Sequence, residues 1–474
     1  MKSFLTNLLG ADRVLDTTDS LAAYSEDYTE AEPAAPDLVA MVHSTEEVQA
    51  IVKEAGARKI PLTPRVYGTN VGGLALASEG GVILDMTGMN RIIEVSGDDW
   101  YAVIEPGVTQ IQLKQYLIAR EIPLTFGFSL APPDTSVFAN ALLGGLTNRS
   151  LKYGDQSQSI SGLEVVTADG SLARTGAWAV EGVPPYGRVP LPDLTGLFVG
   201  WAGTTGIVTR MAFQLWPKHP IERRIFYLTY DVDATFDIMH RLCRAEICED
   251  IGGLSWPSAK MMLGVKRPHP EPSEGDPLFF LYLDLAADTE EQLAARQAIV
   301  ASCFRPLVDG GALVDGPLDI TELVRVNKAL DKFSEFPTNL DFLTDHGGGG
   351  LSWIGTYGPV SRFARAAHVA TEIMASRGWP PVIVSRPMRG GHYGVIRFIT
   401  TFDKRDPAEV SRVREVNAAL LEALTDEGFL MYKTPVWAWK ALAPRMDPGM
   451  LRLMKDVKGL LDPQRIFNPG KLGL

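Results

Sequence analysis

Two clusters of polar side chains in the second half of the chain could hold or deprotonate a small anionic molecule. The first contains Arg386, Arg389 and His392, where guanidinium groups can neutralise a carboxylate or a phenolate and an imidazole can act as a base near neutral pH. The second is Tyr432 followed by Lys433, a phenol beside an ammonium. A surface histidine at a strand end, with arginines paired to surface acids, remains the alternative interpretation of the first cluster.

Aromatic residues accompany these clusters. Trp353, Tyr357, Trp437 and Trp439 would provide a wall against which a planar substrate can stack. Aromatic residues at such spacings more often pack in a core, so we expect only one or two of the four to line a site.

A glycine-rich loop in the first third of the chain has the composition of an anion-binding loop. It runs from Arg65 to Gly73, and its glycines allow backbone N–H groups to approach a pyrophosphate closely. The spacing matches neither the G-x-G-x-x-G of Rossmann folds nor the P-loop pattern. The loop alone is weak evidence, because most glycine-rich loops are only turns.

Strands alternate with helices before about residue 219. Ser44 and Glu47 have the spacing of a capping box, and apolar residues then recur at helical spacing up to Gly56. Asp169-Gly170 between two apolar pairs predicts a hairpin. Further strands are predicted at 82–84, 92–95 and 101–104.

After about residue 219 the pattern becomes one of strand–helix units with long connections. Strands are predicted at 225–230, 278–283, around 353 and at 395–402, and helices at 289–304, from 361 onward and at 408–427. Repeated units of this kind predict an α+β region in which helices cover one face of a sheet.

Composition restricts the class of protein. Of the 474 residues, 46% are hydrophobic and 22% are charged, as in a globular protein of roughly two or three domains. The 57 acidic residues exceed the 45 Lys and Arg, and a net charge of −12 without a basic run argues against nucleic acid as a partner. Three cysteines without metal-ligand spacing and seven dispersed histidines predict neither a disulfide framework nor a metal site.

The N-terminus has neither the apolar segment nor the cleavage site of a signal peptide. No apolar run approaches the roughly 20 residues that cross a bilayer. We therefore expect a cytoplasmic protein without a membrane span. No G-x-S-x-G elbow supports a hydrolase.

Five ordered segments give the chain a resemblance to a known family. They are the glycine-rich loop, Ile104–Gly107, Tyr153–Asp155 with Leu163–Gly170, Gly196–Phe198 with Gly206–Thr209, and Leu461–Leu472. Together they resemble the FAD-binding domain of the vanillyl-alcohol oxidase / p-cresol methylhydroxylase (PCMH) superfamily, over most of the chain from about residue 36.

The resemblance implies an α+β fold in three parts. A PCMH-type FAD-binding domain of two α+β subdomains is expected at 1–218, and an α+β substrate-binding cap domain at 219–425. A C-terminal segment at 426–474 is expected to return to the FAD site.

The resemblance also implies where FAD binds. The glycine-rich loop corresponds to the family's pyrophosphate loop, and 136–145 to a second loop that faces the pyrophosphate and the isoalloxazine ring. The implied cofactor-binding residues are Arg65, Tyr67, Gly68, Thr69, Asn70, Val71, Gly72, Pro133, Ser136, Asn140, Gly144, Gly145, Gly154, Asp155, Gly206, Ile207, Val208 and Lys471.

FAD is expected to be bound without a covalent bond. The position of the family's flavin-linked histidine falls at Gly350 or Leu351, and the glycine-rich loop has no histidine either. His346 or Tyr357 would be the linked residue if the alignment slips across the run of four glycines.

The cap segments resemble the phenol-oxidising branch of the family more than the 2-hydroxy-acid branch. In the family a Tyr-Arg pair binds a phenolate and the flavin. This chain retains the tyrosine as Tyr432 but has Lys433 in place of the arginine, which keeps the positive charge without the two parallel N–H donors of a guanidinium. A second phenolate-binding tyrosine is absent, since Val71 stands there. The acidic residue expected near flavin N5 has no clear match, with Ala131 or Asp134 nearest. The Glu-His-Gly metal motif of the 2-hydroxy-acid branch is absent as well.

The sequence therefore predicts an FAD-dependent oxidoreductase, an oxidase or a dehydrogenase, that transfers a hydride from an aromatic alcohol or alkylphenol-like substrate to flavin N5. The predicted catalytic residues are Tyr432, Lys433, His392 and Arg389, and the predicted substrate-binding residues are Arg386, Trp353 and Tyr357. Two alternatives remain, a D-2-hydroxy-acid dehydrogenase of the same superfamily and a flavin-binding electron-transfer subunit. The family suggests a homodimer, and a cytochrome or another electron acceptor as partner. No metal is expected.

Overall fold

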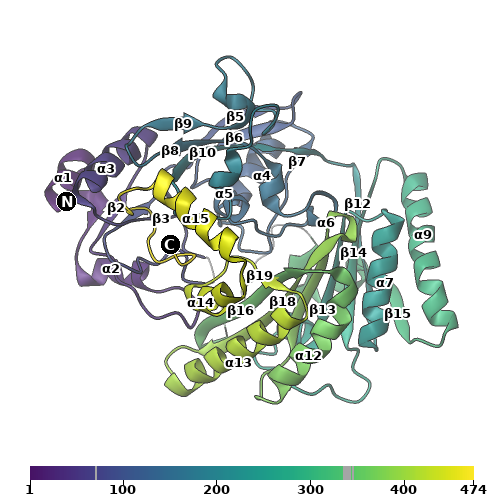
Figure 1. Cartoon of the computed structure of the whole chain (residues 1–474). Coiled ribbons are helices and arrows are strands. Elements are labelled where there is room, and N and C mark those ends of the chain that lie inside the picture. The colour runs from purple at the N-terminus through teal and green to yellow at the C-terminus, as the bar shows by residue number, and fades with distance from the viewer. Residues whose placement is uncertain (70–71, 335–342, 344–345) are drawn as a thin grey trace.

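The first half of the chain forms two sheets and a short ribbon, and the second half forms one larger sheet (Figure 1). The computed structural model describes residues 1–69, 72–334, 343 and 346–474. The first sheet has the strand order β1-β2-β4-β3, the second β5-β6-β10-β8-β9, and β11 pairs with β7. Their bounds are β1 Val14–Leu15, β2 Leu38–Met41, β3 Leu62–Arg65, β4 Val82–Asp85, β5 Ile92–Ser96, β6 Tyr101–Ile104, β7 Leu124–Thr125, β8 Ile160–Val166, β9 Leu172–Arg174, β10 Ile207–Gln214 and β11 Trp216–Pro217.

These sheets confirm the strands predicted in the N-terminal part, and β8 and β9 pair across the predicted hairpin. Of the predicted capping box at the start of α3 (Thr45–Arg58), only the hydrogen bond to Ser44 is confirmed. Ser44 accepts from the backbone N–H of Glu47 at 3.3 Å, but the Glu47 carboxylate accepts from the N–H of His43 at 2.7 Å and pairs with Arg13. The helix also continues through Gly56 to Arg58.

The helices are listed here so that the site can be located. Their bounds are α1 Lys2–Leu9, α2 Thr18–Ser25, α3 Thr45–Arg58, α4 Gln110–Ala119, α5 Val137–Leu142, α6 Ser150–Tyr153, α7 Val232–Ala245, α8 Trp256–Met262, α9 Glu290–Asp309, α10 Ile320–Val326, α12 Phe363–Ala375, α13 Pro407–Asp426, α14 Val436–Leu442 and α15 Pro448–Leu461. None of these described helices is long and apolar enough to cross a membrane.

The large sheet, which we call the cap sheet, has the strand order β15-β12-β14-β13-β17-β18-β16-β19, and its neighbouring strands are antiparallel. Its bounds are β12 Ile221–Thr229, β13 Asp250–Ser255, β14 Phe279–Ala287, β15 Val314–Asp319, β16 Gly349–Gly358, β17 Val382–Met388, β18 Tyr393–Asp403 and β19 Leu430–Met431. Strands β13 and β15 were not predicted, because glycines or prolines interrupt their apolar pattern.

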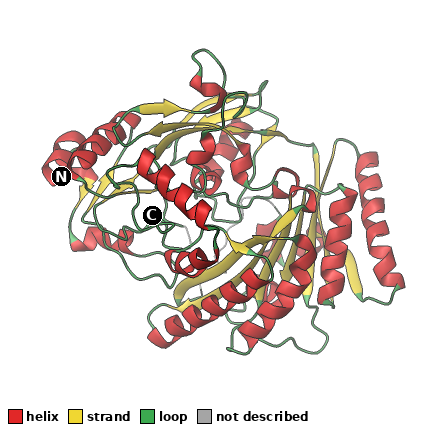
Figure 2. Cartoon of the chain, in the orientation of Figure 1, coloured by secondary structure: helices red, strands yellow, loops and turns green. Residues whose placement is uncertain are grey.

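Helices α7, α9, α12 and α13 cover the outer face of the cap sheet (Figure 2). In β14, Phe279, Leu281 and Leu283 pack in the core shared with these helices, whereas Phe280 and Tyr282 belong to the opposite face. The predicted α+β arrangement, with helices on one face, is confirmed. The inner face is left to meet the N-terminal half of the molecule.

The C-terminal residues return to the first sheet. The N–H of Leu62 in β3 donates to the carbonyl of Ile466 at 2.7 Å, and the N–H of Asn468 donates to the carbonyl of Leu62 at 2.8 Å. Phe467 between them is fully buried in the N-terminal core. The buried Lys458 of α15 donates to the carbonyl of Thr204 at 2.7 Å.

Candidate active site

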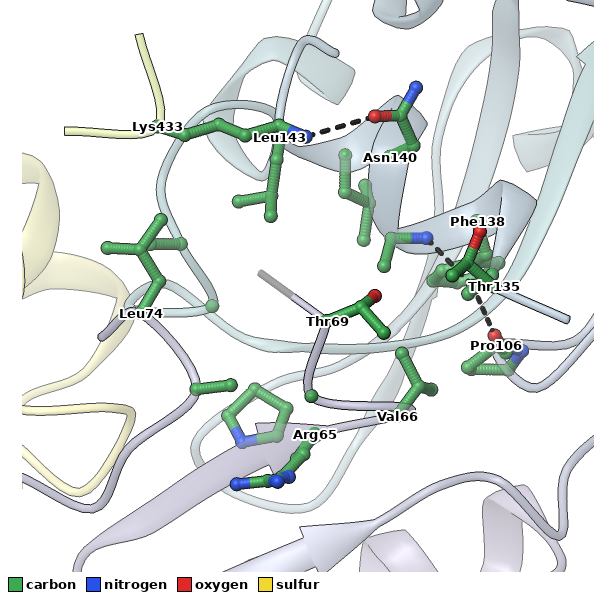
Figure 3. A pocket seen from close by; sticks show the side chains of 18 of the residues that line it. Arg65, Val66, Thr69, Leu74, Pro106, Thr135, Phe138, Asn140, Leu143 and Lys433 are labelled. Carbon is green, nitrogen blue, oxygen red and sulfur yellow. Dashed lines mark hydrogen bonds between the residues drawn. The ribbon is translucent and has the colours of Figure 1, made fainter. Parts of the chain in front are cut away.

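One pocket is walled by the N-terminal half on one side and by the cap sheet on the other. Figure 3 shows the glycine-rich loop at one end and Lys433 at the other. The lining residues are Pro64, Arg65, Val66, Gly68, Thr69, Leu74, Ala75, Met86, Pro106, Ser129, Leu130, Ala131, Thr135, Ser136, Phe138, Ala139, Asn140, Leu142, Leu143, Leu146, Phe198, Ala202, Gly203, Gly206, Val208, Trp353, Arg397 and Lys433.

The glycine-rich loop begins where β3 ends and is fixed by its own side chains. Arg65 donates to the carbonyls of Tyr24 and Ala23 at 3.1 and 3.0 Å. Tyr67 donates through its hydroxyl to the carbonyl of Gly107 at 2.8 Å. Gly68 has a φ of 65°, which is strained for a residue with a side chain, and a Cβ there would displace the Arg65 guanidinium, so this turn favours glycine.

The second wall, at 129–146, is tied both to the N-terminal half and to the cap. Ser136 caps α5, since its hydroxyl accepts from the N–H of Ala139 at 3.0 Å and donates to the carbonyl of Pro106 at 2.6 Å. The Asn140 amide donates to Gln156 at 2.7 Å and accepts from the Lys433 ammonium at 3.0 Å. Figure 3 shows this Lys433–Asn140 contact across the pocket.

Arg397 of β18 is the charged group at the cap end that sequence reasoning missed. Only 5% of it is exposed, its guanidinium donates to the Tyr432 hydroxyl at 2.5 Å, and its carbon lies 5.0 Å from the centre of the Trp353 ring. Its Nε has no hydrogen-bond partner, and no carboxylate among the described side chains forms an ion pair with it. The available signal was one charged residue within an otherwise apolar strand pattern.

Tyr432 and Lys433 lie together beside Arg397. The Tyr432 ring stacks on that of Tyr357, with centres 4.3 Å apart and planes at 4°, and the Tyr357 hydroxyl donates to the carbonyl of Gly144 at 2.6 Å. Burial raises the pKa of Tyr432, while Arg397 acts in the opposite direction. Burial, and secondly the charge of Arg397, lowers the pKa of Lys433 to about 7.

The first predicted cluster is not brought to the pocket. Arg389 and His392 are exposed at the turn between β17 and β18, and neither lines the pocket. Arg386 is 1% exposed, and its guanidinium pairs with the buried Asp250 and donates to the carbonyl of Thr147 at 2.8 Å. The expectation that these side chains converge on a cap pocket is therefore corrected, because two project from a turn and the third is neutralised by an acid.

Some of the other predicted site residues line the pocket and some do not. Those that line the pocket are Arg65, Gly68, Thr69, Ser136, Asn140, Gly206, Val208, Trp353 and Lys433. Those that do not are Tyr67, Gly72, Pro133, Gly144, Gly145, Gly154, Asp155, Ile207, Lys471, Tyr357, Tyr432, Trp437 and Trp439. Asn70 and Val71 lie outside the described residues.

Lys471 is fully buried away from the pocket lining. Its ammonium donates to the carbonyl of Leu76 at 3.0 Å and to the hydroxyl of Ser78, and burial lowers its pKa to about 8. Lys471 therefore holds the residues that follow the glycine-rich loop. Within the described ranges no group of three or more His, Cys, Asp or Glu could hold a metal ion.

Comparisons with known proteins agree with this geometry. Residues 36–176 match the family described as an FAD binding domain, and residues 229–472 match the C-terminal domain of FAD linked oxidases. The glycolate oxidase subunit GlcD of Bacillus subtilis (strain 168) is 31% identical, over 100% of this chain and 96% of its own. The 4-cresol dehydrogenase (hydroxylating) flavoprotein subunit of Pseudomonas putida is 27% identical, over 98% of this chain and 94% of its own.

A solved structure has the same fold over almost the whole chain. The crystal structure of p-cresol methylhydroxylase with substrate bound superposes with a TM-score of 0.87 at 25% identity, covering 99% of this chain and 95% of that one. A third curated relative is the D-2-hydroxyglutarate dehydrogenase of Stutzerimonas stutzeri (strain A1501), which is 27% identical over 99% of this chain and 97% of its own.

Proposed function

The chain belongs to the FAD-linked oxidoreductases of the vanillyl-alcohol oxidase / PCMH superfamily, and from this premise we propose that it oxidises an aromatic alcohol or alkylphenol-like substrate that binds as an anion. The single observation that carries the proposal is Arg397, a guanidinium 5% exposed with an unpartnered Nε. Because a buried charge without a counterion is unfavourable, this end of the pocket favours an anionic ligand.

The pocket residues fit FAD. The lining runs from the glycine-rich loop to the cap and is mostly apolar, as the rings of a flavin cofactor require. A Cβ at Gly68 would overlap Arg65, and a Cβ at Gly206 would overlap Val165. Because these two positions carry no side chain, a cofactor could approach the backbone closely there. Arg65, Gly68, Thr69 and Ser136 would hold the cofactor, which supplies the acceptor for the substrate's hydride.

The protein's own groups would orient the substrate. Trp353, which lines the pocket, offers a ring face beside the Arg397 guanidinium. The Tyr432 hydroxyl, which does not line the pocket, accepts from Arg397 at 2.5 Å and would hold that guanidinium in position for the substrate. Leu130, Leu143 and Leu146 supply apolar wall and limit water near the reacting carbon.

A D-2-hydroxy acid is the second candidate substrate. Arg397 could equally bind its carboxylate, and the 31% identical relative is a glycolate oxidase subunit. The aromatic side chains around Arg397 favour the first candidate. Anaerobic mixing of the FAD-loaded protein with 4-hydroxybenzyl alcohol, 4-ethylphenol, D-lactate and D-2-hydroxyglutarate decides between them. We expect the phenols to bleach the flavin absorbance; bleaching by the hydroxy acids alone would replace the proposal, and bleaching by none would favour an electron-transfer subunit.

FAD is expected to be held without a covalent bond. No His, Cys or Tyr occurs among the described residues that line the pocket. Of the two alternatives, the Tyr357 hydroxyl donates to Gly144 and the His346 ring contacts the carbonyl of Gly350 at 2.8 Å. Acid precipitation followed by centrifugation should leave the yellow colour in the supernatant. Colour retained in the washed pellet would indicate a covalent link.

Lys433 should make kcat/KM depend on pH. Its ammonium is present below the pKa of about 7 and is lost above it. For a substrate that stays anionic across the range, kcat/KM is therefore expected to fall above that pKa by up to about tenfold per pH unit. Lys433→Arg is the matched control, because a guanidinium stays charged and should give a flat profile. An identical decline in Lys433→Arg would assign the titration to another group.

A further inference from the structure

The residues Glu26–Glu32, between α2 and β2, join the glycine-rich loop to the cap; we call this segment the strap. On the loop side, one carboxylate oxygen of Asp27 accepts from the backbone N–H of Gly73 at 2.7 Å and from that of Gly72 at 3.5 Å. Its other oxygen accepts from the N–H and the hydroxyl of Thr29, at 2.8 and 2.6 Å. Both oxygens of the carboxylate are therefore held in place.

On the cap side, the strap is fixed by groups on three elements. The Lys404 ammonium, just after β18, donates to the carbonyl of Asp27 at 2.6 Å and to the carboxylate of Glu26 at 2.8 Å. The N–H of Leu351 in β16 donates to the carbonyl of Tyr28 at 2.7 Å. The buried Glu30 carboxylate accepts from Asn417 of α13 at 2.7 Å.

Asp27 thus acts on a part of the loop that lies between two pocket-lining stretches. Gly72 and Gly73 are followed by Leu74 and preceded in the loop by Thr69, both of which line the pocket. The backbone at Gly73 has a φ of 70°, one of several conformations that glycine adopts readily, so an external contact is needed to select it. The carboxylate supplies that contact through charge-assisted hydrogen bonds.

We propose that Asp27 is a positioning residue for FAD, and that the cap, through Lys404, fixes the loop by way of the strap. This role rests on the proposed function, in which the glycine-rich loop holds the cofactor. Neither Asp27 nor Lys404 lines the pocket. A change at Lys404, on the cap, therefore alters the binding of a cofactor that it does not touch.

The test is titration of the cofactor-free full chain with FAD, followed by flavin fluorescence. We expect Asp27→Asn to raise the Kd for FAD about tenfold or more, because a charge-assisted bond becomes a neutral one. Lys404→Met should raise it by about three- to tenfold. Glu32→Gln is the matched control in the same segment, since the Glu32 side chain is 78% exposed and forms a surface ion pair with Arg414 on α13, and it should stay within about twofold.

A second measurement separates positioning from general stability. Riboflavin lacks the pyrophosphate, so its Kd should be the same in Asp27→Asn and in the unaltered protein, and the thermal midpoint of the cofactor-free variant should not change. Equal weakening of riboflavin and FAD, or an unchanged Kd for FAD in both variants, would overturn the proposal. Failure of the unaltered chain to bind FAD at all would instead refute the function on which the proposal rests.

Discussion

Replacement of Arg397 by methionine is expected to lower kcat/KM for the best substrate by about 10²–10³-fold, the loss that removal of one buried charge contact to a transition state produces. The guanidinium is buried, faces the pocket, donates to the Tyr432 hydroxyl and lies over the Trp353 ring. Its charge has no carboxylate partner among the described residues, so methionine at this position should not lower the thermal midpoint. Steady-state kinetics and thermal unfolding measure the two effects.

The chain offers a matched control for this substitution. Arg389 lies at the exposed turn before β18 and does not line the pocket. Arg389→Met should therefore keep kcat/KM within about twofold, since surface charges away from the site contribute little. Equal losses in the two variants would show that net charge, and not the buried contact, governs substrate binding.

Arg386→Met is expected to destabilise the protein by about 3–5 kcal/mol, because it leaves the carboxylate of Asp250 buried without its partner. The two side chains are 2% and 1% exposed, and Tyr282 also donates to Asp250, at 2.9 Å. Burial raises the pKa of Asp250 and Arg386 opposes that shift, so the loss of Arg386 removes the main stabiliser of the charged form. Urea unfolding monitored by tryptophan fluorescence measures the change.

A double variant distinguishes a structural pair from a substrate-binding arginine. Arg386→Met with Asp250→Asn should be less destabilised than Arg386→Met alone, because the second change removes the buried charge. The single variant should retain the KM of the unaltered protein when assayed at low temperature. A fully stable Arg386→Met protein with a greatly raised KM would restore Arg386 to the substrate site.

The end of the pocket formed by the glycine-rich loop was the more predictable from sequence, because its residues are contiguous. The glycine-rich loop and 136–145 are short stretches in which each side chain or glycine acts within its own turn, as Arg65 and Gly68 do. Seven of the residues expected to bind FAD line the pocket: Arg65, Gly68, Thr69, Ser136, Asn140, Gly206 and Val208.

The cap end was less predictable, because the register of distant strands decides it. Arg386 and Arg397 lie on the same face of neighbouring strands, since Arg386 is paired with Val395 and Arg397 with Val384. What separates their roles is Asp250 on β13, a strand that sequence reasoning did not find because Gly252 and Gly253 interrupt it. Without that strand, nothing in the sequence indicates which arginine is paired with a buried carboxylate and which faces the pocket.

The docking of the C-terminal residues on β3 has a consequence for biosynthesis. Asn468 donates to the carbonyls of Leu74 and Ala202 at 3.1 and 2.6 Å, and both of those residues line the pocket. Residues 462–471 follow every strand of the cap sheet in the chain, so they are translated after it. The N-terminal half therefore cannot make these two contacts, which hold pocket-lining residues from behind, until the strands of the cap sheet have been translated.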